Sequence, residues 1–580
     1  MIFKSMGLKV RSFKRHYACA LAIVVVGIFG GLLGSFCSPG PDFGHHHEEP
    51  DNGYLAGVKT SLEKVFRDPE RLKGELSQRA IVGAARNEYE HFQIILVSHG
   101  GDLENIEIES TQLTCLDQGE VIQKENIAFY QVGYVETKRP AYDVEFVGWW
   151  PDPLIPLEQF DLAEGKVQPI WVTIYIPEST PSGDYQGCIK IIPENAEAET
   201  VEVGLTVWDF TLPEESSLQA VFSLYEEVIR DFYRFDVLPP ELLRRYYSFL
   251  LAHRINPTSL YLRGDPQPRL ENLEFCVDRG LNALNIAYLY DWGHSGGTKA
   301  HLSDEYERNL TASLSHTVAF LREHGWLEKA FIYGPDEPGQ RDYSAVREML
   351  SLVGRMAPGV RRVVTVGPVE DLYGYVDVWV PRIGDYDAEK CRRRQAIGEE
   401  VWLYVCASPL HPYPNFFVDY PAIDHRILFW MAWKYDISGF LYYSLNRWMT
   451  NQSNGQERWP DIPWNTFTWR DYNGDGQLIY PGRGGEPYSS IRLEIIRDGI
   501  EDFEYLHMLQ ARMRELAEGE LESQSPLLYS AEDLLAAMKE KAVSDFTHYT
   551  KDENQLLEYR ELVAEEIVRL SRILEGGTGF

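Results

Sequence analysis

Residues 401–444 read VWLYVCASPLHPYPNFFVDYPAIDHRILFWMAWKYDISGFLYYS, and their pattern recurs through nearly half of the chain. Val401–Cys406 and Gly439–Ser444 are short apolar runs bounded by turn residues, which is typical of buried strands. The stretch between them is long enough for a helix and carries Trp430 and Trp433. Strand, helix and strand in this order predict two parallel strands joined by a helical crossover.

The same alternation begins after the segment Thr211–Ser217 and continues to residue 489. Amphipathic stretches such as Pro240–His253 and Leu310–His324 separate many of the candidate strands. The eight candidate strands are Ala220–Tyr225, Thr258–Leu262, Ala283–Tyr288, Lys329–Tyr333, Arg362–Val366, Val376–Val380, Val401–Cys406 and Gly439–Ser444. Eight alternations over about 270 residues predict a (β/α)8, TIM-like barrel, and a distorted barrel of seven or eight strands fits the pattern equally well.

Regions with different patterns flank this predicted barrel, which spans residues 213–489. Residues 54–212 alternate short β-branched and aromatic runs with turn signals, which predicts an antiparallel β-sandwich. Residues 490–580 place Leu, Glu, Ala and Arg at helical spacing, which predicts a small helical cap packed on the barrel. Cys115 and Cys188 fall in the predicted sandwich, where they could form a disulfide.

The pattern of the first 53 residues predicts a targeting segment followed by a flexible tether. Five basic residues precede Tyr17, and residues 17–36 carry no charge, so residues 1–36 have the pattern of a signal or anchor segment. Leu33–Cys37 resembles a bacterial lipobox, which makes Cys37 a candidate for lipidation; an uncleaved anchor and an ordinary signal are the alternatives. Residues 37–53 contain Pro, Gly, Asp and His, which predicts a flexible tether. We therefore expect an extracytoplasmic protein, membrane-tethered in a bacterium.

Composition limits the possible partners. Hydrophobic residues make up 44% of the 580 positions, which is enough apolar material for several folded domains. The 88 Asp and Glu residues outnumber the 55 Lys and Arg residues, for a net charge of −33. A surface this acidic repels nucleic-acid phosphates and anionic lipid head groups. We expect no nucleic-acid partner, and membrane contact only through the N-terminal segment.

Two adjacent carboxylates follow the fourth candidate strand. Phe331–Tyr333 ends that strand, and Asp336 and Glu337 come next between Pro335 and Pro338. Active sites of (β/α)8 enzymes lie at the C-terminal ends of the strands, so this pair is a candidate for acid–base chemistry. The flanking prolines restrict the backbone and help to fix the direction of both side chains. The alternative is an acidic loop without chemistry, which is common in a chain this acidic.

Aromatic residues cluster after the third and eighth candidate strands, and six of the 14 tryptophans fall between residues 430 and 469. Flat aromatic faces with polar neighbours suit sugar rings. The candidates for substrate binding are Tyr290, Trp292, Tyr443, Asn446 and Trp448. Packing is the alternative role, and it is the one we expect for Trp430 and Trp433.

Asp471–Gly476 imitates the start of a calcium-binding loop. Position 12 of that loop would be Gly482, where an EF-hand has a bidentate Glu, so we expect a tight turn and no metal site. The cysteines show no CxxC pair and no spacing that is typical of metal ligands.

Three stretches resemble glycoside hydrolase family 123. They are Phe331–Pro338 (FIYGPDEP), Leu428–Trp448 (LFWMAWKYDISGFLYYSLNRW), and Gly474–Gly482 (GDGQLIYPG) followed by Ser490–Tyr505 (SIRLEIIRDGIEDFEY). The resemblance runs from about Val221 to Leu509, with the predicted sandwich in that family's usual place. Ion pairing at a helix start explains the charged residues of the last stretch as well as chemistry does, so they are not assigned to the site: Arg497, Asp498, Glu501 and Asp502.

The resemblance implies a retaining exo-glycosidase that hydrolyses terminal β-linked N-acetylgalactosamine of glycans or glycolipids and needs no cofactor. Glu337 would be the general acid/base at the glycosidic oxygen, and Asp336 would hold and polarise the 2-acetamido N–H. The acetamido oxygen would attack the anomeric carbon and form an oxazolinium intermediate. The spacing agrees, because an ordinary retaining pair flanks the sugar about 5–5.5 Å apart, whereas sequence neighbours serve one side of the ring. The alternatives are a non-catalytic glycan-binding surface protein and a glycosidase for a different sugar.

Overall fold

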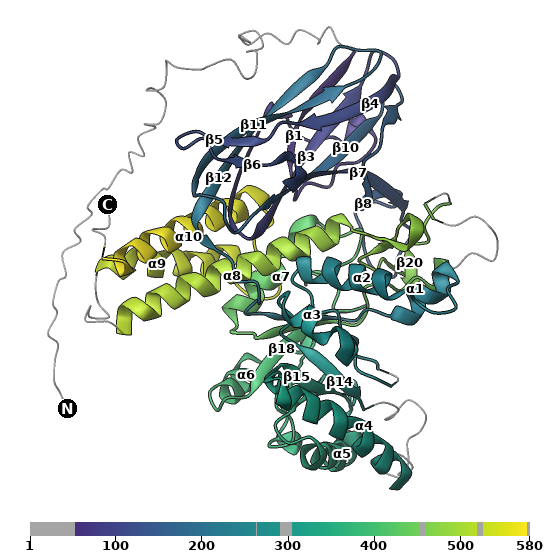
Figure 1. The fold of residues 1–580 in the computed structure, drawn as a ribbon, viewed down its shortest axis with the longest axis vertical. Helices are drawn as coiled ribbons and strands as arrows, with labels where there is room; N and C mark the ends of the chain where they lie inside the picture. The colour runs from purple at the N-terminus through teal and green to yellow at the C-terminus, as the bar shows by residue number, and fades with distance from the viewer. Residues whose placement is uncertain are drawn as a thin grey trace, which may run out of the picture. The chain divides into compact units, whose positions relative to one another are not determined.

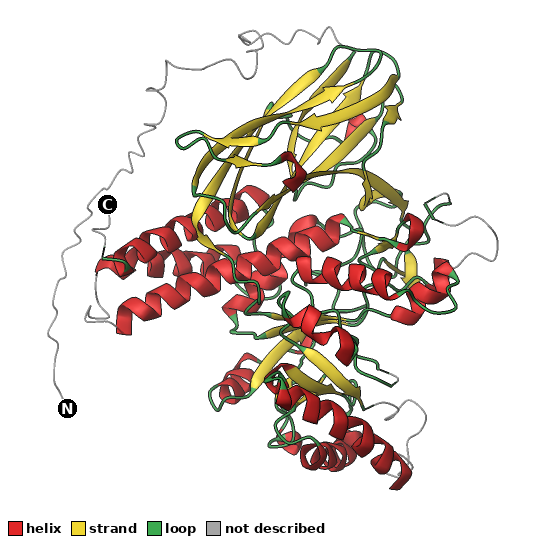
Figure 2. Cartoon of the chain, viewed as in Figure 1, coloured by secondary structure: helices red, strands yellow, loops and turns green. Residues whose placement is uncertain are grey.

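The computed structural model describes residues 53–262, 264–289, 304–451, 459–460, 462–518 and 526–576 (Figures 1 and 2). The chain divides into two units, residues 1–49 and 50–580, and every described residue belongs to the second. The predicted signal or anchor segment and Cys37 therefore lie outside the described residues. None of the described helices is both long enough and apolar enough to cross a membrane.

Two β-sheets form the N-terminal region, as the alternating runs predict (Figure 2). The first sheet has the order β1 (Tyr54–Thr60), β3 (Glu88–Ser98), β10 (Val167–Ile176), β7 (Ile127–Glu136) and β8 (Trp149–Pro156). The second has the order β2 (Arg79–Arg86), β12 (Glu199–Thr211), β11 (Gly183–Ile192), β4 (Leu103–Ser110) and β9 (Phe160–Leu162). Two short strands extend the second sheet, since β5 (Leu113–Cys115) pairs with β11 and β6 (Val121–Ile122) pairs with β5. Neighbouring strands run antiparallel, and the exception is the parallel pair of β2 and β12.

The two sheets share one apolar core. Ile170, Val172 and Ile174 of β10 are fully buried in it, because every second side chain of a strand faces the same side. Cys115 is a buried free thiol on β5, so the disulfide with Cys188 that the sequence permits is not formed.

Seven parallel strands form the central sheet. Their order is β13 (Gln219–Phe222), β19 (Gly439–Tyr442), β18 (Glu400–Tyr404), β17 (Val378–Trp379), β16 (Arg361–Val364), β15 (Ala330–Tyr333) and β14 (Leu284–Tyr288). Each coincides with a predicted strand, and every pair of neighbours is parallel. The described residues thus give a sheet of seven parallel strands with β13 and β14 at its two ends. The strand count agrees with the seven-strand alternative, but closure of the sheet into the predicted barrel is not confirmed.

The second predicted strand, Thr258–Leu262, is not a strand among the described residues. Asn256 makes a single parallel bridge to Val221, and its backbone N–H donates to the Ala220 carbonyl at 3.0 Å. On the other side, the Asn285 amide donates to the carbonyls of Ser259 and Leu260, each at 2.9 Å. The Thr258 carbonyl also accepts from the Leu224 N–H at 3.0 Å, so isolated backbone bonds connect this segment to β13. On the β14 side the Asn285 amide takes the place of a backbone ladder, and the predicted strand is wrong at this position.

Helices and short hairpins connect and cover these strands. The helices of this region are α1 (Glu226–Tyr233), α2 (Pro240–Ala252), α3 (Leu273–Val277), α4 (Asp304–Glu323), α5 (Tyr343–Met356), α6 (Ala388–Gln395) and α7 (Ala422–Lys434). The hairpins after β19 pair β20 (Phe467–Trp469) with β21 (Tyr472–Asn473), and β22 (Tyr480–Pro481) with β23 (Pro487–Tyr488). The predicted helix between residues 401 and 444 is α7, which is buried on nearly all sides because it lies against a further helix, α8.

The C-terminal region is helical, as predicted, but it forms a layer between the β-sheets of the N-terminal region and the central part (Figure 1). It contains α8 (Ile491–Glu518), α9 (Pro526–Ala537) with a π-helical turn over Met538–Ala542, and α10 (Glu553–Leu574). Helix α8 packs against α7 on one side and contacts β3 and β8 on another, while α10 packs on α8 and contacts β12. The C-terminal helices therefore form an intermediate layer, and the predicted helical cap on the barrel is not confirmed.

Buried ion pairs hold the layer in place. Asp502 of α8 accepts hydrogen bonds from Arg426 of α7 at 2.6 and 2.8 Å and from Arg560 of α10 at 2.9 Å. The Trp430 indole N–H also donates to Asp502, at 2.8 Å. Arg560 also forms an ion pair with Glu88 of β3, so the network joins the helices to the N-terminal sheets. Packing accounts for Trp430, as expected from the sequence. Ion pairing accounts for Asp502, although this residue lies inside α8 and not at a helix start.

We predict that Asp502→Asn strongly destabilises the protein. Removing one partner of a buried pair leaves Arg426 and Arg560 short of an acceptor, which costs about 3–5 kcal/mol of unfolding free energy. Urea unfolding followed by tryptophan fluorescence measures the loss, with Asp533→Asn on the exposed side of α9 as the matched control. Equal unfolding midpoints for the two variants would show that the network contributes no stability.

Candidate active site

Asp336 and Glu337 lie on the loop directly after β15, as predicted. The loop leaves the strand through Gly334, whose φ is +106° and whose N–H donates to the Val363 carbonyl at 2.9 Å. A Cβ at position 334 would approach the Leu289 carbonyl oxygen to 3.0 Å, so glycine is required by both conformation and space. Asp336 is half-buried beyond this turn, and Glu337 is exposed.

Three hydroxyl groups hold the Asp336 carboxylate. The Tyr333 hydroxyl donates to Oδ1 at 2.5 Å, and the Thr365 hydroxyl donates to the same oxygen at 2.9 Å. The Tyr261 hydroxyl donates to Oδ2 at 3.3 Å. An ionised carboxylate only accepts hydrogen bonds, so this set of donors matches the charged form and fixes both oxygens.

Glu337 is held at its backbone and at one carboxylate oxygen. Its N–H donates to Thr365 Oγ1 at 2.7 Å, and the Tyr404 hydroxyl donates to its Oε1 at 2.6 Å. The φ angle of Glu337 is +44°, in the left-handed region. Residues with a Cβ adopt this conformation at a cost of about 1–2 kcal/mol, and such strain persists where the surroundings enforce it.

Tyrosine rings border the carboxylates. The rings of Tyr288 and Tyr333 stack with centroids 5.7 Å apart, and Tyr261 meets them edge-on at 5.2 and 5.8 Å. Burial and the Asp336 carboxylate raise the pKa of both Tyr261 and Tyr333. Burial and the Glu337 carboxylate raise the pKa of Tyr404 in the same way. These hydroxyls therefore stay protonated and act as donors at physiological pH.

The sequence interpretation missed these partners, although a signal for them was present. Each lies within the last three residues of a predicted strand, at the edge where the chemistry was expected: Tyr261, Tyr288, Tyr333, Thr365 and Tyr404. The C-terminal ends of parallel strands meet at one edge, so polar residues at those positions converge. Tyrosine and threonine are also common core residues of strands, so their residue type alone does not distinguish a role in the site from packing.

Two predicted substrate-binding residues serve packing. Asn446 is fully buried, and its amide pairs with the backbone N–H and carbonyl of Tyr225, each at 2.9 Å. Trp448 is also fully buried, and its indole N–H donates to the Ile479 carbonyl at 2.9 Å. Neither side chain offers a free face to a sugar in this structure.

The other three predicted binding residues differ in what the structure shows. Tyr443 is half-buried beside Gly476, and its carbonyl accepts from the Tyr225 hydroxyl at 2.9 Å. The ring of Tyr225 in turn lies 6.5 Å from that of Tyr261, so Tyr225 lies between Tyr443 and the tyrosines around Asp336. Tyr290 and Trp292 lie outside the described residues.

The segment Asp471–Gly476 folds as a turn that begins with β21. Gly474 and Gly476 have φ angles of +78° and +72°. Asp475 between them is fully buried, and this burial raises its pKa to about 7, opposed by hydrogen bonds from Tyr443 and Tyr442. Over the described part of the chain, His, Cys, Asp and Glu residues form no group of three or more that could hold a metal ion.

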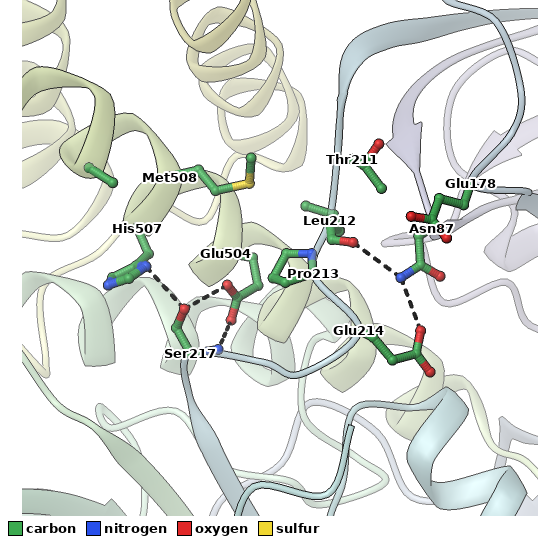
Figure 3. A pocket seen from close by; sticks show the side chains of 11 residues that line it. Asn87, Glu178, Thr211, Leu212, Pro213, Glu214, Ser217, Glu504, His507 and Met508 are labelled. Carbon is green, nitrogen blue, oxygen red and sulfur yellow. Dashed lines mark hydrogen bonds between the residues drawn. The ribbon is translucent and has the colours of Figure 1, made fainter. Parts of the chain in front are cut away.

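A pocket of about 410 Å³ lies elsewhere, at the connection from β12 to β13 (Figure 3). Ser217, His507 and Glu504 meet there, which superficially suggests a hydrolytic triad. The Ser217 hydroxyl donates to Glu504 Oε2 at 3.0 Å, so at its 3.0 Å contact with His507 Nδ1 it can only accept. His507 therefore cannot remove the serine proton in this arrangement. The pocket also precedes β13, at the edge of the sheet opposite to the one that Asp336 follows.

Carboxylates at the C-terminal edge of a parallel sheet, bordered by aromatic rings, are an arrangement compatible with enzymes that cleave glycosidic bonds. Comparison with protein families shows which family of such enzymes the chain matches. The model described as "Glycoside hydrolase 123, catalytic domain" matches residues 283–509, and the "Glycoside hydrolase 123 N-terminal domain" model matches residues 66–192. The two models together match more than half of the chain, and the protein belongs to glycoside hydrolase family 123.

One solved structure agrees with this assignment at the level of the fold. A family 123 glycoside hydrolase from Clostridium perfringens, studied for glycolipid glycan hydrolysis, is 16% identical with a TM-score of 0.66, over 90% of this chain and 98% of that one. A Bacteroides ovatus family 5 xyloglucanase is 9% identical over 73% of this chain and 98% of its own. A family 39 glycoside hydrolase from Bacteroides cellulosilyticus is 10% identical over 74% and 82%. The last two have TM-scores of 0.27 and 0.29, which are too low to indicate a shared fold. No curated protein sequence matches the chain.

Proposed function

We propose that the protein is a retaining exo-glycosidase that removes terminal β-linked N-acetylgalactosamine, with the 2-acetamido group of the substrate as the nucleophile. The observation that carries this proposal is the adjacency of an anchored Asp336 and an exposed Glu337 on one loop. The relative from Clostridium perfringens, studied for glycolipid glycan hydrolysis, supports a glycan or glycolipid as the substrate class.

The surroundings of the two carboxyl groups suit different roles. Asp336 accepts from three hydroxyls, which fix its carboxylate in a position suited to receive the acetamido N–H. Glu337 is exposed and has one hydroxyl donor, from Tyr404, so it can exchange its proton with solvent between turnovers. A proton donor and a fixed acceptor on neighbouring residues serve the leaving oxygen and the acetamide on one side of the sugar.

The reaction then has two steps. In the first, the bond between the anomeric carbon and the glycosidic oxygen breaks, Glu337 gives its proton to that oxygen, and the acetamido oxygen bonds to the anomeric carbon. Asp336 stabilises the positive charge that develops on the acetamide. In the second step, water attacks the anomeric carbon, gives a proton to Glu337 and reopens the oxazolinium ring. Two inversions at the anomeric carbon give net retention of configuration.

A panel of nitrophenyl glycosides tests the sugar assignment. We expect the full chain to hydrolyse the β-N-acetylgalactosaminide fastest and the β-N-acetylglucosaminide more slowly. The β-galactoside lacks the acetamido nucleophile, so we expect no detectable turnover of it. Faster hydrolysis of the β-galactoside would contradict the proposed mechanism. Binding of the sugars without any hydrolysis would favour a non-catalytic glycan-binding protein.

We also propose an extracytoplasmic location with lipidation at Cys37. Support comes from the five basic residues before Tyr17 and the uncharged residues 17–36. In a bacterial host grown with radiolabelled palmitate, we expect the full chain to carry label, the Cys37→Ser variant to lose it and the control Cys19→Ser to keep it. If the wild-type protein carries no label, Cys37 is not lipidated, and the N-terminal segment is an ordinary signal or an uncleaved anchor.

A further inference from the structure

We propose that Thr365 is a positioning residue that ties Asp336 and Glu337 into one unit. This inference rests on the proposed function, in which the two carboxyl groups divide the chemistry. Thr365 directly follows β16, the neighbour of β15, and only 5% of its surface is exposed. Its hydroxyl lies 2.9 Å from Asp336 Oδ1 and 2.7 Å from the Glu337 backbone nitrogen.

The direction of each hydrogen bond follows from the groups involved. A threonine hydroxyl has one proton and two acceptor lone pairs. The Glu337 N–H can only donate, so Thr365 Oγ1 accepts there. The carboxylate of Asp336 can only accept, so the threonine proton points to its Oδ1. One hydroxyl group therefore satisfies the backbone of one residue and the side chain of the other.

No other side chain makes this double contact among the residues that the structure describes. Of the two carboxyl residues, Tyr261 and Tyr333 contact only Asp336, and Tyr404 contacts only Glu337. The Tyr333 hydroxyl also contacts Thr365 Oγ1, at 3.5 Å. Without the Thr365 hydroxyl, the remaining donors would be the two tyrosines beside Asp336 and Tyr404 beside Glu337, and none of them contacts both residues. What would be lost is the link that sets the position of one carboxyl group relative to the other.

The strained backbone of Glu337 gives this link its mechanical role. A glutamate with a φ of +44° returns to the favoured negative region unless its surroundings hold it. Thr365 binds the N–H of that same residue, at one end of the rotating bond. Freeing the N–H permits the rotation, which moves the Glu337 carboxyl group away from the side of the sugar that Asp336 serves.

The variants Thr365→Val and Thr365→Ser in the full chain test the role. Valine keeps the branched shape and loses the hydroxyl, whereas serine keeps the hydroxyl. For the β-N-acetylgalactosaminide we expect Thr365→Val to lower kcat by about 10- to 100-fold with a smaller change in KM, because misplaced groups act mainly on the reacting state. We expect Thr365→Ser to retain most of the wild-type kcat. The control Thr317→Val removes a buried threonine hydroxyl on α4, which bonds to the Ser313 carbonyl, and should leave kcat unchanged.

Two kinetic outcomes would overturn the inference while leaving the proposed function intact. One is a wild-type kcat in Thr365→Val. The other is an equal loss in Thr365→Val and Thr365→Ser, which would assign the effect to packing. A crystal structure of Thr365→Val supplies a readout that is independent of activity. We expect the φ angle of Glu337 to leave the left-handed region, and an unchanged loop would overturn the inference. If the wild-type protein hydrolyses no glycoside, the proposed function fails, and this crystal structure still decides the role of Thr365.

Discussion

Replacing Glu337 by glutamine is expected to lower kcat for a β-N-acetylgalactosaminide by about 10²- to 10⁴-fold, the usual contribution of a general acid. Glutamine fills the same space and cannot supply a proton to the glycosidic oxygen. The Tyr404 hydroxyl, which donates to Glu337 Oε1, can still donate to the amide oxygen, so the loop should remain in place. Steady-state kinetics of the full chain measure the effect, with Glu348→Gln on the exposed face of α5 as the matched control.

The leaving group distinguishes an acid from a residue that only shapes the loop. A dinitrophenyl group departs without protonation, so the first step of Glu337→Gln should be nearly normal with such a substrate. A poor leaving group, such as a second sugar, should show the full loss. If Glu337→Gln lowers kcat/KM by the same factor for both substrates, Glu337 does not act as the general acid.

Replacing Asp336 by asparagine is expected to cost about 10²- to 10³-fold in kcat, which is typical of removing one charge-stabilising group from a reacting centre. Two effects combine. The negative charge that would polarise the acetamido N–H disappears, and the asparagine amide nitrogen cannot accept from Tyr261 or from the pair Tyr333 and Thr365. Kinetics with the β-N-acetylgalactosaminide measure the loss.

A thiazoline derived from N-acetylgalactosamine separates the role of Asp336 from a general disturbance of the site. This compound imitates the bicyclic oxazolinium intermediate, and calorimetry gives its affinity. We expect the Asp336→Asn variant to bind the thiazoline much more weakly than the wild type, but to bind galactose, which has no acetamide, about equally. If Asp336→Asn binds the thiazoline as tightly as the wild type does, Asp336 does not interact with the acetamido group as proposed.

Regular apolar runs made most of the fold predictable. The seven strands of the central sheet and α7 combine strong local patterns with burial, so their positions could be predicted from the sequence. The predicted strand Thr258–Leu262 fails because the side-chain amide of Asn285 binds the Ser259 and Leu260 carbonyls, which a backbone ladder would otherwise use. Side-chain hydrogen bonds of this kind leave no periodic signal in the sequence.

Some residues of the candidate site could also be predicted from the sequence, and others could not. Asp336 and Glu337 could be predicted because they combine a carboxylate pair with the end of a strand. Asn446 has the residue type and position of a sugar ligand, and only the structure shows that its amide is used by the backbone of Tyr225. The role of Thr365 depends on the contact between neighbouring strands, which are separated in sequence by α5.

The most direct test of the account varies the nucleophile itself. A series of 4-nitrophenyl β-N-acetylgalactosaminides with zero to three fluorine atoms on the acetyl methyl group weakens the acetamido oxygen step by step and leaves the rest of the sugar unchanged. If the substrate supplies the nucleophile, kcat/KM of the full chain falls steeply and regularly with each fluorine. A value of kcat/KM that stays the same across the series would contradict substrate-assisted hydrolysis and would require a nucleophile from the protein.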